Sequence, residues 1–396
     1  MKGRKIALGV TGGIAAYKAC ELASRLKKRG ADVRVVMTEA ATRFVAPLTF
    51  ESLTGNRVEL DMFSRPWEMG HISLAKFAEL FVVAPATADI IGKFACGIAD
   101  DMLSTALMAA TCPVLLAPAM YGGMWKSAAV QANIQTLASR GIPMIGPGRG
   151  RLACGDDDIG RMVEPAEIVD EIERLLHAKK DLAGVHVAVT AGPTREFADP
   201  VRFLSNRSTG KMGYAIARAA RNRGAKVTLI TGPTSIEPPR GVEVVNITST
   251  QDLYHAATAC AEHADVVIQS AAPADFRPAE YCETKIKKTG EGMALQLAST
   301  PDVARALGEN KRPGQILVAF AAETNDLREN AKGKLLRKNA DLIVANDVTI
   351  PGAGFGTDTN CAFLITRDGE VEVPLCEKTE LADRILDAVV DLRHAE

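Results

Sequence analysis

Two residues in the first half of the chain have side chains that could do chemistry. Cys154 lies in the polar stretch Leu152–Asp156, where a thiol is not needed for packing and could be reactive. His71 lies in Met69–Ser73, just ahead of an apolar helical stretch. A histidine can exchange a proton near neutral pH, but a lone histidine can equally cap a helix or lie on the surface. Both residues are therefore candidate catalytic residues, and their role depends on their surroundings in the fold.

A glycine-rich turn near the start of the chain could bind a phosphate group. Thr11, Gly12 and Gly13 separate the β-branched run Lys5–Val10 from a helical pattern over Ile14–Arg29. Backbone N–H groups at such a helix N-terminus attract anions. The turn does not match G-x-G-x-x-G, and no suitable acidic residue ends the second strand, so a dinucleotide is disfavoured. A plain tight strand–helix connection is the alternative.

Two more turns of this half follow expected strands. Pro85–Asp89 is rich in small and hydroxylated residues and follows a strand over Leu80–Ala84. Pro118–Trp125 follows a strand over Val114–Ala117. Ligands of open α/β sheets collect at the carboxyl ends of the strands, so both turns are candidate ligand contacts. The methionines and tryptophan of the second turn could instead pack on the core.

The second half also places polar residues after expected strands. The run Ser205–Gly213 begins a helix whose N-terminus could bind a nucleotide phosphate or a carboxylate. It is not a Walker A loop, because no glycine stands five residues before Gly210 and no Ser or Thr follows Lys211. The lysine cluster Lys285–Lys288 comes ten residues after Asp275. It could be a solvated surface or a phosphate clamp.

A strand–turn–helix–strand pattern that occurs twice must position these residues. The second copy has strands at Val185–Thr190 and Lys226–Thr231 and a helix at Gly210–Arg223. The alternation predicts an α/β fold with two doubly wound, Rossmann-like domains, each built on an open parallel sheet. A polar stretch at 177–184 separates them, which gives domains at 1–180 and 185–396.

Composition and charge exclude several classes of function. The 396 residues include 47 basic and 48 acidic side chains, and the net charge of −1 argues against a nucleic-acid or polybasic membrane-binding protein. The start of the chain lacks the features of a signal peptide, and no apolar run is long enough to cross a bilayer. The 8 cysteines form no C-x-x-C pair, so we expect free thiols, no zinc cluster and a cytoplasmic protein.

The motifs of the first half resemble the flavin-dependent cysteine decarboxylases. They are GVTGGIAAYK, MGHISL, PATAD, PAM–GGMW and ACGD–GRM, in that order over residues 5–165. The resemblance implies a flavodoxin-like domain that binds FMN and decarboxylates 4′-phosphopantothenoylcysteine. In this chemistry the flavin oxidises the substrate thiol to a thioaldehyde, CO2 is lost, and the resulting enethiol is reduced again. The cofactor carries the electron transfer and the protein orients the substrate.

The resemblance assigns a role to each matching residue. His71 would orient or deprotonate the substrate, and Cys154 would donate a proton. Substrate contacts would come from Tyr121 and Met124. The implied flavin or phosphate contacts are Gly12, Gly13, Ile14, Thr38, Thr87, Ser104, Thr105 and Met120.

Four residues of the first half depart from the family pattern. Tyr121 stands where the family has an asparagine that binds the substrate carboxylate, and Asp100 also replaces an asparagine. Lys126 and Ser127 stand where the family often has an asparagine. Tyrosine keeps a hydrogen-bond donor but is longer and more rigid than an amide. We therefore hypothesise that Tyr121 slows decarboxylation without preventing flavin binding.

The second half resembles the phosphopantothenate–cysteine ligases over residues 184–390, through SNRSTGKMG, KIKK, FAAET and KNADLIVAND. The resemblance implies that CTP and the substrate carboxylate form an acyl-cytidylate, which cysteine then attacks, with Mg2+ on the triphosphate. Asn206 would contact the acyl-cytidylate, Lys285 would assist its formation and conversion, and Lys211 would bind substrate. The implied nucleotide contacts are Gln269, Ser270, Ala271, Asp275, Lys285, Pro301, Asp302, Val303, Ala304, Phe320, Lys334 and Lys338. No metal ligands can be named.

Together the halves resemble a bifunctional family of coenzyme A biosynthesis. Its substrates would be 4′-phosphopantothenate, cysteine and CTP, with neither nucleic acid nor membrane as a partner. The resemblance implies a homo-oligomer, a dodecamer built from trimers of the first half and dimers of the second. Two alternatives remain: a nicotinamide oxidoreductase, which the missing G-x-G-x-x-G disfavours, and a working ligase whose flavin half is impaired or regulatory.

Overall fold

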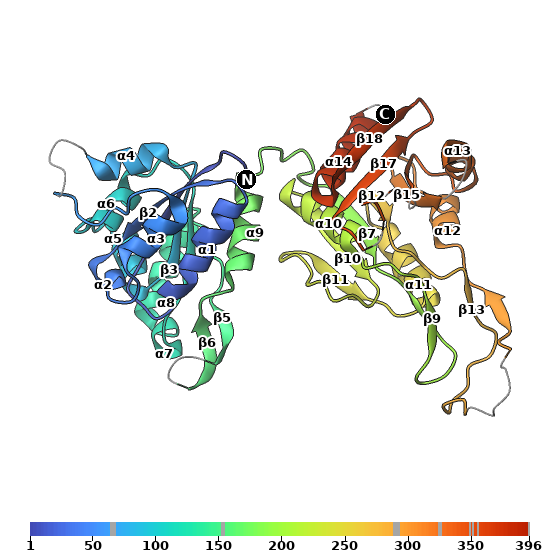
Figure 1. The fold of residues 1–396 in the computed structure, drawn as a ribbon, viewed down its shortest axis with the longest axis horizontal. Coiled ribbons are helices and arrows are strands. Elements are labelled where there is room, and N and C mark those ends of the chain that lie inside the picture. Colours follow the sequence, from blue (N-terminus) through green and yellow to red (C-terminus); the bar gives the residue numbers. More distant parts are fainter. Residues whose placement is uncertain are drawn as a thin grey trace. The chain divides into compact units, whose positions relative to one another are not determined.

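A computed structural model of the chain describes residues 1–63, 69–151, 155–287, 294–323, 327–347, 350, 352–354 and 356–394. The chain divides into two compact units, Met1–Leu176 and His177–Glu396, called here the N-terminal and the C-terminal unit (Figure 1). Each unit has its own sheet and its own hydrophobic core. Cys154 lies outside the described residues.

The N-terminal unit is built on a four-stranded parallel sheet with the order β2-β1-β3-β4. All four strands are β-branched or apolar runs, and β3 and β4 are buried along their whole length, as expected for a sheet covered on both faces. The strand order reverses between β1 and β3, which is where open α/β sheets bind ligands. The strands are β1 (Lys5–Val10), β2 (Asp32–Met37), β3 (Leu80–Ala86) and β4 (Val114–Pro118).

Helices cover both faces of this sheet. Alternate side chains of β1 point to opposite faces, so that Ile6 and Leu8 join one core and Ala7 joins the other. Helices α1 (Ala16–Lys28), α3 (Pro47–Thr54) and α9 (Pro165–Leu176) pack on the first face. Helices α4 (Gly70–Phe77), α5 (Ala88–Cys96), α6 (Met102–Ala109) and α8 (Ala128–Ser139) pack on the second. The remaining elements are α2 (Glu39–Thr42), α7 (Gly122–Trp125), β5 (Gly148–Arg151) and β6 (Asp157–Arg161).

The C-terminal unit has an eight-stranded sheet with the order β11-β10-β7-β12-β15-β16-β17-β18. The first six strands in this order are parallel, whereas β17 pairs antiparallel with both β16 and β18. The strands are β7 (His186–Ala191), β10 (Lys226–Thr231), β11 (Glu243–Asn246), β12 (Val266–Gln269), β15 (Ile316–Glu323), β16 (Leu342–Asp347), β17 (Thr359–Ile365) and β18 (Glu370–Glu377).

The antiparallel edge corrects the expectation of an all-parallel second sheet. Strands β17 and β18 are joined by a short turn that the hydrogen bond from Thr366 N to Gly369 O closes at 2.9 Å. A turn this short can join only antiparallel strands, because a parallel connection needs a crossover of a dozen or more residues. The Asp368-Gly369 pair was the sequence signal for this hairpin.

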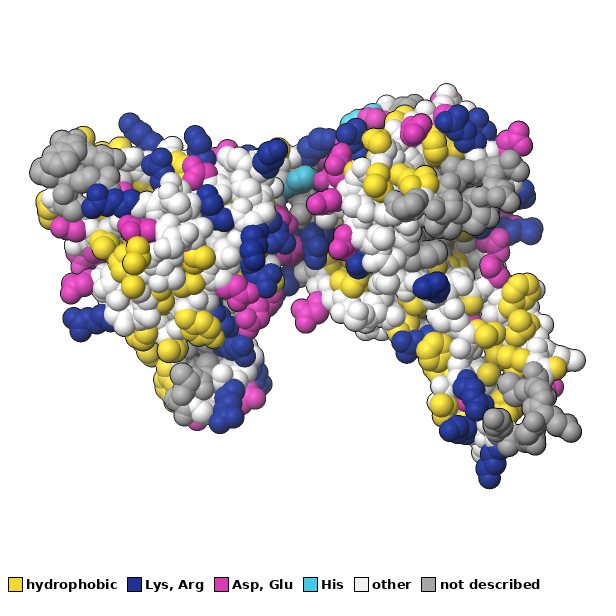
Figure 2. All heavy atoms as spheres, in the orientation of Figure 1, with side chains coloured by type: hydrophobic (Ala, Val, Ile, Leu, Met, Phe, Trp, Pro, Cys, Tyr) yellow, Lys and Arg dark blue, Asp and Glu magenta, His cyan; other side chains and the backbone are white. Residues whose placement is uncertain are grey.

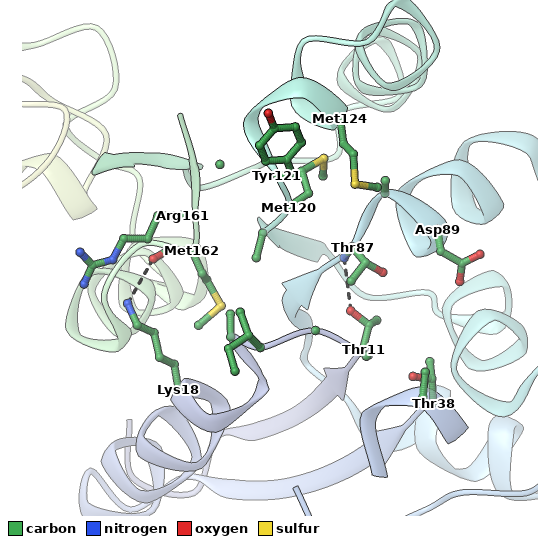
Figure 3. A pocket seen from close by; sticks show the side chains of 18 of the residues that line it. Thr11, Lys18, Thr38, Thr87, Asp89, Met120, Tyr121, Met124, Arg161 and Met162 are labelled. Carbon is green, nitrogen blue, oxygen red and sulfur yellow. Dashed lines mark hydrogen bonds between the residues drawn. The ribbon is translucent and has the colours of Figure 1, made fainter. Parts of the chain in front are cut away.

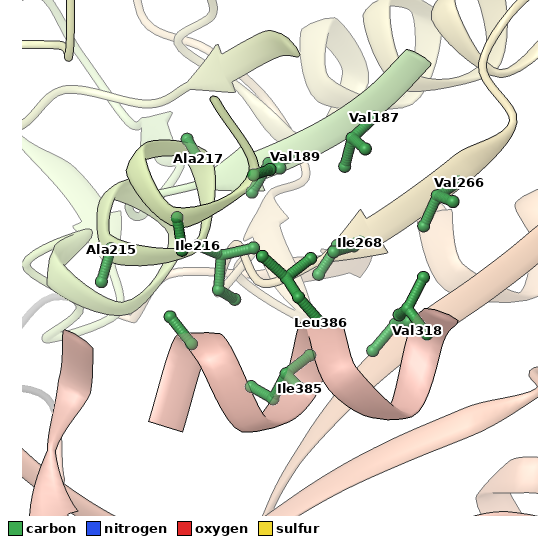
Figure 4. Close-up of a cluster of buried hydrophobic side chains, with 14 of the residues drawn as sticks. Val187, Val189, Ala215, Ile216, Ala217, Val266, Ile268, Val318, Ile385 and Leu386 are labelled. Atoms are coloured by element: carbon green, nitrogen blue, oxygen red, sulfur yellow. The ribbon is translucent and has the colours of Figure 1, made fainter. Parts of the chain in front are cut away.

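Helices also cover both faces of the second sheet. On one face, Ile216 and the pair Ile385 and Leu386 pack against valines and isoleucines of β7, β12 and β15 (Figure 4). They belong to α10 (Lys211–Asn222) and α14 (Lys378–His394). The other face is covered by α11 (Thr250–Ala261), α12 (Val303–Glu309) and α13 (Leu327–Arg337). Two small antiparallel ribbons complete the unit: β8 (Arg195–Phe197) with β9 (Phe203–Ser205), and β13 (Phe276–Pro278) with β14 (Leu297–Ser299).

Candidate active sites

A cavity of about 1200 Å³ opens at the carboxyl ends of the strands of the N-terminal unit (Figure 3). Its lining residues come from the segments that follow β1, β2, β3 and β4, together with Arg151 and residues 160–162 of the β5–β6 ribbon. Ligand pockets commonly measure roughly 300–1,000 Å³, so this cavity can hold a cofactor together with a substrate. The predicted residues Gly12, Gly13, Ile14, Thr38, Thr87, Met120, Tyr121 and Met124 all line it.

Thr11 ties two strand ends together at the floor of the cavity. Its hydroxyl donates to the carbonyl of Pro85 at 2.7 Å and accepts from the N–H of Thr87 at 3.2 Å (Figure 3). Thr11 itself is only 2% exposed, so these bonds also satisfy a buried polar group. The end of β1 is thereby fixed to the end of β3, where the strand order reverses.

Small residues let the backbone approach the cavity closely. A Cβ added to Gly12 would lie 2.4 Å from Cβ of Ala40, so no larger residue fits there without movement. Gly160 has φ +141, and a Cβ there would lie 2.2 Å from the carbonyl oxygen of Met120. Glycine at these two positions keeps the turn after β1 and the β5–β6 ribbon close to their neighbours, so that backbone groups rather than side chains shape the wall.

A buried lysine carries positive charge to one side of the cavity. The Lys18 side chain is 8% exposed, and its Nζ lies 2.9 Å from Oε1 of Glu164 and 3.4 Å from the carbonyl oxygen of Met162. Arg161 donates to the same Glu164 carboxylate at 2.7 Å. The hydrogen bond from Lys18 lowers the pKa of Glu164 below its usual value. Because one carboxylate faces two cations here, this corner attracts a further anion.

Lys93 gathers three carboxylates on the other side. Its Nζ lies 3.0 Å from Asp100, 3.3 Å from Asp101 and 3.4 Å from Asp89. The hydrogen bond from Lys93 lowers the pKa of Asp100, so the residue that departs from the family asparagine is held as a carboxylate. Burial opposes the charge on Lys93, but the bonds to the aspartates outweigh it and raise its pKa.

Met120, Tyr121 and Met124 form an apolar lip above the cavity (Figure 3). The Tyr121 ring lies over Gly123, where an added Cβ would come within 2.7 Å of its Cε1, and Tyr121 is 54% exposed. Behind the lip, Lys126 pairs with Asp158 of β6 at 2.7 Å. This ion pair holds α7 against the β5–β6 ribbon and gives Lys126, another departure from the family pattern, a structural partner.

Three residues of the predicted flavin site are not brought to this cavity. Ser104 is buried and its hydroxyl belongs to the capping box that Asp101 makes at the start of α6, while the Thr105 hydroxyl donates to the carbonyl of Ala99. His71 lies in the first turn of α4 and does not line the cavity. Its Nδ1 is buried and has no hydrogen-bond partner among the described residues. Cys154 lies outside them.

The ion pair between Lys18 and Glu164 was not predicted from the sequence. Lys18 lies four residues before Leu22 on the buried stripe of α1, and a lysine on an apolar helix face was the available signal. Glu164 had no signal, because its partner Lys18 lies 146 residues away in the sequence.

In the C-terminal unit, Asn206 reaches the turn that follows β12. Its Nδ2 donates to the carbonyl of Pro273 at 2.8 Å and approaches that of Ala272 at 3.3 Å. Asn206 directly follows β9, so the β8–β9 ribbon delivers this amide to the switch point between β7 and β12. The structure thus brings Asn206 next to the predicted contact Ala271.

Two threonines organise the same strand ends. Thr190 donates to Oε1 of Gln269 at 2.8 Å and accepts from the N–H of Ala271 at 3.0 Å. Thr194 accepts from the N–H of Ala274 at 3.0 Å. The Gln269 side chain is buried in this network, so any contact from Gln269 to a ligand must come through its backbone.

The N-terminus of α10 was predicted to bind a phosphate or a carboxylate. Gly210 caps it with φ +81, and a Cβ on Gly213 would lie 2.6 Å from Cβ of Ala191, which places the helix against the end of β7. Lys211 Nζ donates to the carbonyl of Gly356 at 3.0 Å and to Asp358 at 2.7 Å. The Lys378 Nζ donates to the carbonyls of Gly354 and Thr357, in the loop that Lys211 also contacts. Burial lowers the pKa of Lys378 to about 8.

The other predicted nucleotide contacts have different local surroundings. Asp302 caps α12 and pairs with Lys338 at 3.3 Å, which joins α12 to the end of α13. Val303 and Ala304 are buried, and Phe320 packs against the core. The carbonyl of Asp275 accepts from the N–H of Thr300. Pro301 and Ser270 are half-buried, Lys285 is exposed, and Lys334 lies on α13.

Neither a metal cluster nor a membrane span is found in the described part of the chain. Within the described residues, no three His, Cys, Asp or Glu side chains converge as metal ligands. Over those same ranges, no helix is long and apolar enough to cross a membrane.

Comparison with known proteins matches both units. Residues 1–177 match the family described as Flavoprotein, and residues 182–392 match the DNA/pantothenate metabolism flavoprotein C-terminal domain. The coenzyme A biosynthesis bifunctional protein CoaBC of Bacillus subtilis (strain 168) is 48% identical over 99% of this chain and 98% of its own. The CoaBC protein of Escherichia coli (strain K12) is 44% identical over 98% of this chain and 97% of its own.

A crystal structure of the C-terminal domain of a coenzyme A biosynthesis bifunctional protein CoaBC is also similar, with 40% identity. It covers 55% of this chain and 100% of its own, with a TM-score of 0.48. The full-length identities, together with the two family matches, show that the chain belongs to the bifunctional CoaBC family of coenzyme A biosynthesis.

Proposed function

We propose that this chain catalyses two consecutive steps of coenzyme A biosynthesis. The C-terminal unit condenses 4′-phosphopantothenate with cysteine at the expense of CTP, and the N-terminal unit decarboxylates the 4′-phosphopantothenoylcysteine that results. The observation that carries the proposal is the 48% identity to a bifunctional CoaBC protein over 99% of the chain, because it spans both units.

The cavity of the N-terminal unit fits FMN. The glycine turn and the N-terminus of α1 offer backbone N–H groups for the phosphate, and Gly12 leaves no room for a side chain between the turn and Ala40. Thr38, Thr87 and Met120 line the same space. When bound, the flavin supplies the electron transfer that decarboxylation requires.

The chain's own residues then orient the substrate and move protons. We assign the substrate carboxylate to the apolar lip, where Tyr121 presents a phenol hydroxyl. His71 positions or deprotonates the substrate, and Cys154 donates a proton. The buried Nδ1 of His71, which has no hydrogen-bond partner in the described ranges, supports this role, because a substrate or a second protein copy could satisfy it.

In the C-terminal unit, the substrate carboxylate would attack CTP beside Asn206 and the N-terminus of α10. Asn206 orients the acyl-cytidylate, Lys285 stabilises the charge that develops as it forms and reacts, and Lys211 binds an anionic group once it leaves Asp358. Magnesium arrives with the triphosphate of CTP. In this proposal the metal is held mainly by the substrate phosphates.

The proposed assembly is a homo-oligomer. Along the β8–β9 and β13–β14 ribbons, hydrophobic side chains gather on the surface (Figure 2). In the N-terminal unit, Leu48 is 69% exposed and Met69 is 67% exposed, close to His71 in the chain. Exposed apolar groups of this kind are typical of surfaces that bind another protein, and a second copy is the partner we propose. The cytoplasmic location stays a prediction.

One specific residue favours a second possibility, in which the ligase works and the flavin half is impaired or regulatory. Tyr121 replaces the amide that the family uses for the substrate carboxylate. To separate the two possibilities, purified protein is first inspected for flavin absorbance. It is then given 4′-phosphopantothenoylcysteine alone, and CO2 release is measured. Flavin with CO2 release supports the bifunctional enzyme, whereas flavin without CO2 release supports the impaired half.

A further inference from the structure

Asp199 is a completely enclosed carboxylate that neither half-reaction has used so far. It lies in the turn between β8 and β9, and its side chain is 0% exposed. A buried carboxylate is costly unless hydrogen bonds compensate its charge. Asp199 accepts four, and its two oxygens divide them between different parts of the chain.

One oxygen serves the local turn and the other reaches a distant loop. Oδ1 accepts from the N–H groups of Val201 and Arg202, both at 2.7 Å, which closes the turn. Oδ2 accepts from the Arg202 guanidinium at 3.0 Å and from the N–H of Ile286 at 3.1 Å. Ile286 is 87 residues further along the chain, so Oδ2 is a long-range tether.

The tether holds the loop at more than one point. Arg202 also donates to the carbonyl of Ile286 at 3.1 Å, so both polar backbone groups of this residue are occupied by the turn. Four residues earlier, the N–H of Cys282 donates to the carbonyl of Ala198 at 3.0 Å. Residues 282–286 therefore dock along the turn at both ends of the segment.

The turn that contains Asp199 is part of the same ribbon, β8–β9, that leads to Asn206. The Phe197 and Phe203 rings stack edge to face at 5.6 Å, and the Arg195 guanidinium lies 4.8 Å from the Phe203 ring, which stiffens the β8–β9 ribbon. Asn206 follows β9. One rigid ribbon thus carries Asn206 at its base and holds the neighbour of Lys285 at its tip.

We propose that Asp199 is a positioning residue of the ligase reaction: its Oδ2 fixes the backbone of Ile286 and thereby places Lys285 relative to Asn206. The proposal deepens the proposed function and rests on it, since it assumes that Lys285 assists the acyl-cytidylate. Asp199 touches neither substrate nor nucleotide in this account.

The variant Asp199→Asn tests the tether selectively. Its amide oxygen can still accept from Val201 and Arg202, but its NH2 group then faces two donors, Ile286 N–H and the Arg202 guanidinium. We expect kcat for CTP-dependent condensation to fall about 10- to 100-fold, the effect of displacing a catalytic group by about 1 Å, while KM for CTP changes less than about threefold. Trypsin should also cleave after Lys285 or Lys287 several-fold faster.

Two further variants make the test decisive. Asp265→Asn is the matched control, because Asp265 accepts from the backbone N–H of His186 at 2.8 Å at the amino-terminal edge of the sheet. It should leave both kcat and the trypsin rate unchanged. Ile286→Pro removes the N–H that Oδ2 accepts and leaves Asp199 and its turn intact. It should reproduce the loss of kcat even if Asp199→Asn does not fold.

The outcomes distinguish failure of the positioning role of Asp199 from failure of the proposed ligase activity. Wild-type protein that forms no 4′-phosphopantothenoylcysteine from CTP, cysteine and 4′-phosphopantothenate contradicts the proposed function itself. If the wild-type protein is active and either Asp199→Asn or Ile286→Pro has the same kcat, the positioning role is overturned. Loss of kcat in Asp199→Asn with an unchanged trypsin rate also overturns it, because Asp199 would then act by a route other than the loop.

Discussion

At the scale of residues, hydroxyl and amide side chains at strand ends shape both sites. Thr11 accepts the N–H of Thr87 in the N-terminal unit, and Thr194 accepts that of Ala274 in the C-terminal unit. In each case a side chain after one strand holds the backbone after a neighbouring strand. The turns proposed to bind ligands are therefore held in place by these bonds, which would lower the entropic cost of binding.

Tyr121 is the departure from the family pattern that bears most directly on decarboxylation, and we hypothesise that it slows this reaction. We expect Tyr121→Asn to raise turnover of 4′-phosphopantothenoylcysteine about tenfold, which is the effect of roughly 1.4 kcal/mol from a better-placed hydrogen bond to a carboxylate. Flavin content serves as the internal control and should not change, because the substitution leaves the glycine turn, the proposed phosphate site, unaltered. The rate is followed as CO2 release, and an unchanged rate would show that tyrosine already substitutes fully for the amide.

At the scale of elements, the turn between β1 and α1 depends on close packing against α2. Gly12→Ala would place a methyl group 2.4 Å from Cβ of Ala40, whereas Gly13→Ala meets only Cγ2 of Thr87 at 3.7 Å. We expect Gly12→Ala to destabilise the N-terminal unit by about 1–3 kcal/mol, as overpacking does, and Gly13→Ala to leave the stability of the flavin-free unit nearly unchanged. Thermal unfolding of flavin-free protein makes the comparison. Equal midpoints for the two variants would be incompatible with this packing.

Arg223 joins three parts of the C-terminal unit. Its side chain is 1% exposed and pairs with Asp181 at 2.6 Å and with Asp387 of α14 at 2.8 Å. We expect Arg223→Met to destabilise this unit by about 3 kcal/mol, the low end for breaking a buried ion pair, because both aspartates keep part of their solvation. Arg384→Met, which breaks an exposed pair with Glu380 on the same helix, should cost less than about 1 kcal/mol. Urea unfolding distinguishes the two values.

The same ion pairs predict how stability depends on pH. The hydrogen bond from Arg223 lowers the pKa of Asp181; burial opposes the charge on Asp387, but bonds from Lys179 and Arg223 lower its pKa overall. Carboxylates with lowered pKa values stabilise the fold above the ordinary aspartate value of about 4, and this stabilisation is lost as pH falls below it. Asp383, whose pKa burial raises, titrates at higher pH and acts in the opposite direction.

Wild-type protein should therefore lose stability more steeply between about pH 5 and pH 3 than Arg223→Met does. Urea unfolding at a series of pH values measures the difference. Parallel curves for the two proteins would mean that the aspartates are not linked to Arg223.

At the scale of the whole molecule, the sequence predicts the elements better than the contacts between them. The strands at Lys5–Val10 and Lys226–Thr231 are where their apolar patterns place them, because a buried parallel strand must be apolar along its length. The mixed edge of the second sheet was missed, since its signal was a short Asp-Gly turn rather than a periodic pattern. The predicted cavity residues Gly12 and Thr87 come together, because ligand sites follow from sheet topology.

The remaining site residues show that sheet topology alone does not predict which side chains reach a site. His71 does not reach the cavity within one chain, and Ser104 is used to cap α6. The tether from Asp199 to Ile286 spans 87 residues and leaves no trace in local spacing. Such contacts depend on how loops fold back in three dimensions, which periodicity and motif spacing do not encode.

The measurement that tests the central claim most directly gives the purified full-length protein 4′-phosphopantothenate, cysteine, CTP and Mg2+, and follows the products by mass spectrometry. We expect 4′-phosphopantetheine together with CMP and pyrophosphate, in amounts that match the CTP consumed. Accumulation of 4′-phosphopantothenoylcysteine would contradict the proposed decarboxylase half alone. Absence of both products would contradict the bifunctional assignment as a whole.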